Sequence, residues 1–70
     1  MTHENAISFL ERNNLEKQFR GLMADGKNLT LHSDRWSLVF DWIYALRQST
    51  NIDRPEGIET DLTYYWESLI

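Results

Sequence analysis

The sequence lacks cysteine, and its 70 residues include only one proline and three glycines. The absence of cysteine excludes disulfide bonds and thiolate zinc sites, which hold many small domains together. A chain of this size forms one domain, over residues 1–70, and buries only roughly 60% of the surface that its unfolded form exposes. Stability must therefore come from helix packing, from a partner or from self-association.

A secretory leader and a long apolar run are also missing. The opening segment, MTHENAISFLERNN, has no basic stretch followed by an apolar one, so it does not resemble a signal peptide. The most apolar stretch, residues 36–46, is interrupted by Ser37 and Asp41 and is far shorter than the ~20 residues of a membrane span. We therefore expect a soluble, cytoplasmic protein that does not interact with a membrane.

Basic residues are scarce: seven Lys and Arg stand against eleven Asp and Glu, which gives a net charge of -4. Residues 1–35 hold five of each sign, whereas residues 36–70 hold six acids and two bases. This balance argues against nucleic acid as a partner, because nucleic-acid affinity relies on clustered Lys and Arg. It favours a partner with a basic surface, although solubility alone also explains an acidic chain.

Two apolar stripes with the period of a helix occupy the first 25 residues. Thr2 is a candidate N-cap of the first helix. The stripes are rotated relative to each other, which predicts a break at Asn13-Asn14 with Asn14 as the next N-cap; one long helix is the alternative. Gly26 then ends the helix in the left-handed conformation of a C-cap. The stripes comprise Ala6, Ile7, Phe9 and Leu10, then Leu15, Phe19, Leu22 and Met23.

The segments on either side of the next helix are predicted to be connectors. Residues 27–32 form an extended connector anchored by Leu29 and Leu31, or a very short strand. Residues 49–57 carry several helix breakers. The last helix starts near Thr60 or Asp61, although alternation over residues 58–66 also permits a strand. Its apolar stripe comprises Leu62, Tyr65, Trp66, Leu69 and Ile70.

The helix near residues 34–48, capped by Ser33 or Asp34, is apolar around most of its circumference. A narrow polar slice of Ser37, Asp41 and Gln48 meets water. A small bundle covers about half of such a helix, and we expect this half to be the broad face of Trp36, Val39, Phe40, Ile43 and Leu46. The side of Leu38, Trp42 and Ala45 then needs another cover. Three covers remain open: the chain's own Leu29, Leu31, Ile52 and Ile58, a second copy in a homodimer, or a different protein.

No pattern of catalytic or metal-binding residues is present. His3 and His32 have neither a second histidine at helical spacing nor a cysteine nearby. Gly21, Gly26 and Gly57 do not form a phosphate-binding motif. A thin helical core also leaves little room for a catalytic pocket. We therefore expect no enzymatic activity, no metal and no cofactor.

The sequence thus predicts an all-α fold: a small bundle of three to four short helices around a central, mostly apolar helix near residues 34–48. The leading functional hypothesis is a non-enzymatic protein-protein interaction module, a small acidic adaptor, regulator or inhibitor that binds a larger protein. Tyr64 is either a contact residue or an ordinary surface tyrosine. The predicted partner-binding residues are Leu38, Trp42, Glu59, Asp61, Tyr64 and Glu67.

The alternative hypothesis is a small nucleic-acid-binding regulatory protein. Its basic face would consist of Arg12, Lys17, Arg20 and Lys27. Glu11 and Glu16 lie among these residues, so a solvated helix face of mixed charge explains the pattern as well.

Overall fold

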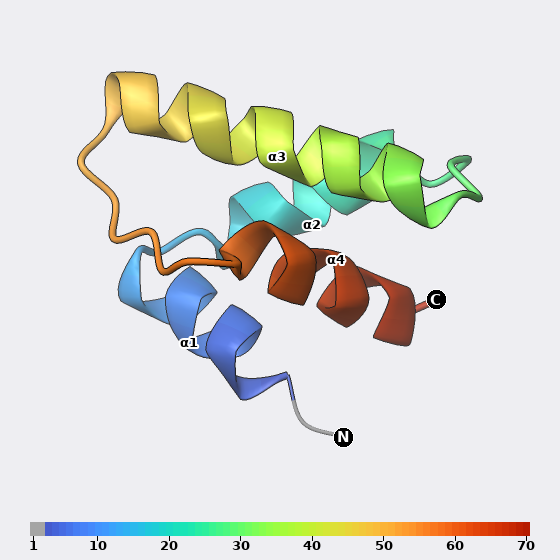
Figure 1. Ribbon diagram of the computed structural model, residues 1–70, viewed down its shortest axis with the longest axis horizontal. Coiled ribbons are helices and arrows are strands. Elements are labelled where there is room, and N and C mark those ends of the chain that lie inside the picture. Colours follow the sequence, from blue (N-terminus) through green and yellow to red (C-terminus); the bar gives the residue numbers. More distant parts are fainter. Residues whose placement is uncertain (1–2) are drawn as a thin grey trace.

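The computed structural model describes residues 3–70, and this part of the chain contains four helices and no strand. They are α1 (Glu4–Arg12), α2 (Glu16–Asp25), α3 (His32–Ser49) and α4 (Ile58–Ser68) (Figure 1). The all-α prediction is confirmed, and the strand alternatives for residues 27–32 and 58–66 are wrong. The predicted cap at Thr2 lies outside the described residues.

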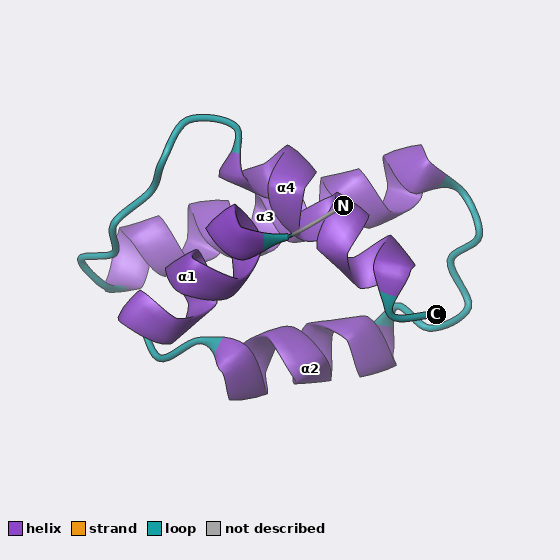
Figure 2. Cartoon of the chain, turned by 90° about the horizontal axis from the view of Figure 1, so that it is seen from below, coloured by secondary structure: helices purple, strands orange, loops and turns teal. Residues whose placement is uncertain are grey.

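Three of the helices lie in one layer and the fourth covers one side of it. Figure 1 shows α3, α4 and α1 stacked in that order, with α2 behind them. Figure 2 shows α2 alone on its side of the molecule. Because α4 packs against both α1 and α3, it is the central helix of the layer. The predicted helix near residues 34–48 corresponds to α3, which is the longest of the four and packs against α4.

One apolar core joins all four helices. Burying a large apolar side chain stabilises the fold by about 1.5–3 kcal/mol, so a core this small depends on each of its members. Leu29, Ile52 and Leu38 are among the partly buried residues packed against it. The fully buried members are Ala6, Phe9, Leu10, Leu15, Phe19, Val39, Ile43, Ile58, Leu62 and Trp66.

The break between α1 and α2 lies where the sequence predicted it. Asn14 has a φ of 56°, a left-handed conformation that asparagine tolerates better than most residues. Its predicted capping role is wrong, because Leu15 occupies the N-cap position and no side chain caps α2. Asn13 instead joins three segments: its amide donates to the Phe9 carbonyl at 2.9 Å, and its Oδ1 accepts from the Asp53 backbone N–H at 3.1 Å.

Gly26 follows α2, but for a different reason from the one predicted. Its φ of -96° is not left-handed, so the predicted C-cap conformation is wrong. A Cβ on this residue would lie 2.6 Å from the Trp66 ring and 2.8 Å from a Leu38 methyl group. Glycine is therefore needed here for close packing of α2 against α3 and α4. The left-handed glycine is Gly57, the N-cap of α4, with a φ of 79°.

The long helix and its connectors differ from the prediction in detail. α3 begins at His32, so Ser33 and Asp34 lie inside its first turn, and no side chain caps it. α4 begins at Ile58, two residues before Thr60. Of the two leucines expected to anchor the first connector, Leu29 packs on the core, whereas Leu31 is exposed.

The burial of residues along α3 shows which of its sides faces the core. Val39 and Ile43 are buried, as expected, and the polar slice of Ser37, Asp41 and Gln48 is exposed. Leu38 and Trp42 also pack against the core, so of the three covers that were open for their side, the chain itself supplies the cover. The cover comes from α2 and the residue after it: the Phe19 ring lies 5.8 Å from the Trp42 ring, and Gly26 packs against Leu38.

Candidate functional site

The apolar side of α3 that stays exposed carries three aromatic residues. Trp36, Phe40 and Tyr44 recur at every fourth position, so they form one stripe along the helix. Their exposed fractions are 37%, 39% and 59%. The Trp36 and Phe40 rings stack with centroids 5.1 Å apart. His32, four residues before Trp36, extends the stripe to the start of α3.

Helix α4 contributes the other side of this surface. The half-exposed Tyr64 ring lies 5.1 Å from the His32 ring, and Trp36 Nε1 donates to Thr60 Oγ1 at 3.3 Å. Because the earlier residue of α3 contacts the later residue of α4, the two helices are antiparallel. The contacts also make the surface continuous across the two helices. We call this surface, composed of His32, Trp36, Phe40, Tyr44 and Tyr64, the aromatic face.

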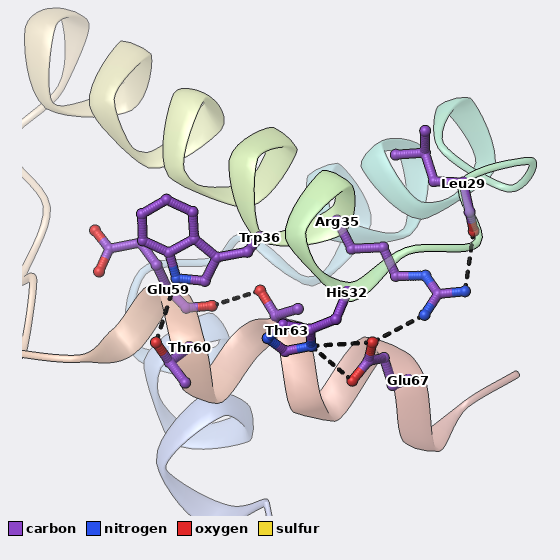
Figure 3. Close-up of polar contacts among 8 residues, drawn as sticks. All are labelled: Leu29, His32, Arg35, Trp36, Glu59, Thr60, Thr63 and Glu67. Carbon is purple, nitrogen blue, oxygen red and sulfur yellow. Dashed lines mark hydrogen bonds and ion pairs between the residues drawn. The ribbon is translucent and has the colours of Figure 1, made fainter.

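A network of polar contacts fixes one end of the aromatic face (Figure 3). His32 Nδ1 lies 3.0 Å from Glu67 Oε1, and Arg35 Nη1 donates to Glu67 Oε2 at 2.9 Å. Arg35 Nη2 also donates to the Leu29 carbonyl at 2.9 Å. The hydrogen bond with His32 lowers the pKa of Glu67 most; partial burial opposes this, and Arg35 lowers the pKa further. The network ties α4, α3 and the connector before α3 together.

A partly buried ion pair fixes the other end. Glu59, with only 4% of its surface exposed, accepts from Arg54 Nε at 2.8 Å and from Arg54 Nη2 at 3.1 Å. Its backbone carbonyl accepts from the buried Thr63 hydroxyl at 2.7 Å (Figure 3). A depression of about 30 Å³ lies between this pair and Phe40 and Tyr44, which is room for about one water molecule.

Unpaired carboxylates lie on the same two helices. Asp34 and Asp41 are exposed on α3, and Asp61 is partly exposed on α4. None of the three forms an ion pair with another residue in the 3–70 range. Asp41 follows Phe40 directly and lies one turn before Tyr44, so its charge borders the aromatic face. Arg47 carries a positive charge near the same border and lines the small depression.

The six side chains predicted to bind a partner do not share one surface. Tyr64 lies on the aromatic face, and Glu67 holds its end. Leu38 and Trp42 pack on the core, and Glu59 is buried against Arg54. Asp61 lines a separate hollow of about 130 Å³ together with His3, Glu4, Asn5 and Ala6.

Sequence reasoning placed Trp36 and Phe40 on the covered side of the helix and did not propose Tyr44 as a contact residue. Their spacing by four was visible, but the same spacing describes a core stripe. A helical wheel gives the angles between side chains and not the direction in which the bundle lies. The side of α3 that faces the bundle depends on its contacts with residues distant in sequence, namely Phe19 and Gly26.

The basic residues of the alternative hypothesis have different surroundings. Arg12 Nη2 lies 2.8 Å from Asp53 Oδ2, so one of the four charges is paired. Arg20 lines a hollow together with Glu11 and Glu16. Lys17 and Lys27 are exposed.

Within residues 3–70, no three His, Asp or Glu side chains come together in a way that could hold a metal ion. None of the described helices combines the length and apolar character that crossing a membrane requires. No protein-family model, curated protein or solved structure matches this chain. The function is therefore argued from geometry.

Proposed function

We propose that this chain is a non-enzymatic protein-interaction module that binds a larger protein through its aromatic face. The observation that carries the proposal is the continuous run of exposed rings across α3 and α4. A chain with so thin a core would gain stability by burying Trp36 and Phe40, yet it leaves both more than a third exposed. Aromatic residues, Trp and Tyr above all, supply much of the binding energy in protein interfaces.

The chemistry of the face favours a partner with a basic surface. The exposed carboxylate of Asp41, at the border of the face, is free to meet Lys or Arg of a partner. An arginine that approaches Trp36 or Tyr44 also gains a cation–π interaction of about 0.5–2 kcal/mol. Such charges mainly raise the rate of association and exclude wrong partners. A small acidic adaptor, regulator or inhibitor of the cytoplasm matches this description.

The test is capture of a partner from an extract of the native host by the tagged chain. Phe40→Ala combined with Tyr44→Ala should abolish the capture, because it removes two exposed rings of the face. Leu31→Ala is the matched control, since Leu31 is an exposed apolar residue outside the face. A partner captured equally by both variants would contradict the proposal.

Two competing outcomes can be distinguished with the purified chain. Light scattering that shows a dimer, converted to monomer by the Phe40 and Tyr44 variant, would assign the face to a second copy. A mobility shift with random DNA or RNA at low salt, lost on Lys17→Ala with Arg20→Ala, would favour the nucleic-acid alternative.

A further inference from the structure

A second hollow lies on another side of the molecule, between α1, α2 and the end of α4. It encloses about 360 Å³ and is lined by the apolar side chains of Ile7, Leu10, Phe19, Met23, Tyr65 and Leu69. Leu69 is nine residues after Thr60, so at about 100° per residue the two point to opposite sides of α4. This hollow, the apolar groove, is therefore separate from the aromatic face.

The floor of the groove is rigid and its edges are open. Leu10 and Phe19 are buried in the core, and the Phe19 and Tyr65 rings stack with centroids 5.9 Å apart and an angle of 11° between them. Ile7 and Leu69 form exposed edges. A site with a fixed apolar floor needs little reorganisation when an apolar group enters it.

Three charges border the groove, and two of them are negative. Glu11 and Glu16 stand on either side of the break between α1 and α2, and Arg20 lies one helical turn after Glu16. None of these groups is in an ion pair with another described residue. Both carboxylates are exposed, so the end of the groove at the break is acidic.

We propose that the apolar groove binds an amphipathic helix of a partner protein, whose Lys or Arg residues meet Glu11 and Glu16. A groove walled by helices that receives apolar side chains at positions i, i+3, i+4 and i+7 is a common mode of peptide recognition. The volume lies within the range of about 300–1,000 Å³ that holds a ligand or a few side chains. The acidic end supplies the charge complementarity that orients such a helix.

Two other occupants fit the groove less well. Specific small molecules are oriented by polar groups inside a pocket, whereas the charged groups here stand at the exposed rim. A second copy would offer its aromatic face, the exposed apolar stripe of α3. Asp41 borders that stripe and would bring a like charge against Glu11 and Glu16.

The test uses two labelled helical peptides with identical leucine spacing, one flanked by lysines and the other by glutamates. In fluorescence anisotropy at low salt, the lysine peptide should bind at least about tenfold more tightly, and the difference should shrink as salt is added. Glu11→Lys with Glu16→Lys should reverse the preference, with unchanged helix content by circular dichroism. This reversal would distinguish recognition of the peptide's charge from nonspecific binding of its apolar residues.

A matched pair of variants locates the site. Leu69→Glu places a charge at the edge of the groove and should abolish binding of the lysine peptide. Leu31→Glu is the control, because Leu31 and Leu69 are 60% and 53% exposed and only Leu69 lines the groove. Methyl resonances of Ile7 and Met23 should shift on binding, and ring resonances of Phe40 should not.

Several outcomes would overturn this inference. They are a lysine peptide that does not bind, equal binding of the two peptides, or resonance shifts confined to the aromatic face. Binding of an apolar dye without binding of either peptide would assign the groove to a small ligand. A dimer that Leu69→Glu converts to monomer would assign it to a second copy. A groove that binds no peptide leaves the proposal for the aromatic face untouched, so the two proposals fail separately.

Discussion

Gly26, the residue directly after α2, packs against α3 and α4 so closely that there is no room for a side chain. A Cβ would come within 2.8 Å of atoms of both Trp66 and Leu38. These belong to a large buried ring and to a side chain packed on the core, so neither moves away freely. One residue type at this position thus sets how closely two helices approach the end of a third.

Gly26→Ala should therefore destabilise the fold by about 1–3 kcal/mol, the usual cost of overpacking. Gly21→Ala is the matched control, because a Cβ on Gly21, within α2, meets nothing within 4 Å. That change should stabilise the helix by roughly 0.5–1 kcal/mol. Urea denaturation of both variants measures the difference, and equal effects would contradict the packing described here.

Glu67 is the residue whose charge the fold perturbs most clearly. Its pKa is lowered in the folded chain, chiefly by the hydrogen bond with His32. A lowered pKa means that the ionised form stabilises the fold. That contribution is complete above the ordinary pKa of glutamate, about 4.3, and is lost as the pH falls through the lowered value.

Glu67→Gln should therefore reduce stability at neutral pH, and its deficit relative to the unmodified chain should disappear at acidic pH. Chemical denaturation from about pH 2 to about pH 7, a range that starts well below the ordinary pKa of glutamate, measures this. Glu56→Gln serves as the control, since Glu56 is exposed and makes no ion pair with another residue in the 3–70 range. A deficit independent of pH would show that the charge of Glu67 does not stabilise the fold.

At the scale of elements, the orientation of α3 about its own axis decides which aromatic residues reach the surface. Trp42 faces the core beside Phe19, whereas Phe40, two residues earlier, faces outward beside Trp36. Two large aromatic side chains on one helix are thus expected to respond in opposite ways to the same substitution.

Trp42→Asp should unfold the chain or cost at least about 3–5 kcal/mol, because it removes a large packed side chain and places a carboxylate against the core. Phe40→Asp should keep the helix content and a cooperative thermal transition. Circular dichroism of the two variants makes the comparison. If Trp42→Asp folded normally, the orientation of α3 described here would be wrong.

At the scale of the whole molecule, the aromatic face and the apolar groove lie on opposite sides of α4. The core residues Leu62 and Trp66 of this helix are fully buried between them. A chain with two separate binding surfaces can join two partners, which is the defining property of an adaptor. This role rests on both proposals together.

Variants on the two surfaces should therefore act independently. Leu69→Glu should abolish binding of the lysine peptide and leave capture through the aromatic face unchanged, and Phe40→Ala with Tyr44→Ala should do the reverse. The free-energy effects of substitutions at two sites that share no contacts are expected to add within about 0.3–0.5 kcal/mol. Loss of both activities in either variant would show that the surfaces are coupled.

Much of the fold was predictable because it depends on local signals. The apolar periodicity identified all four helices, and Asn13-Asn14 marked the break between the first two. The exact starts of α3 and α4 were not predictable, since neither helix has a side-chain cap. The site was harder: Tyr64 was expected at the surface, where it lies, whereas the cover of Leu38 and Trp42 was left open and Trp36 and Phe40 were expected to be covered.

The sequence by itself determined the helical class, the places where helices break and the polar side of α3 that meets water, because these follow from the spacing of apolar and polar residues along the chain. Only the tertiary structure decided which apolar side of α3 stays exposed and that α1, α2 and α4 enclose a groove. The physical reason is that both depend on contacts between residues distant in sequence. Gly26 against Trp66 and Phe19 against Trp42 are such contacts. Periodicity along a single helix does not encode them.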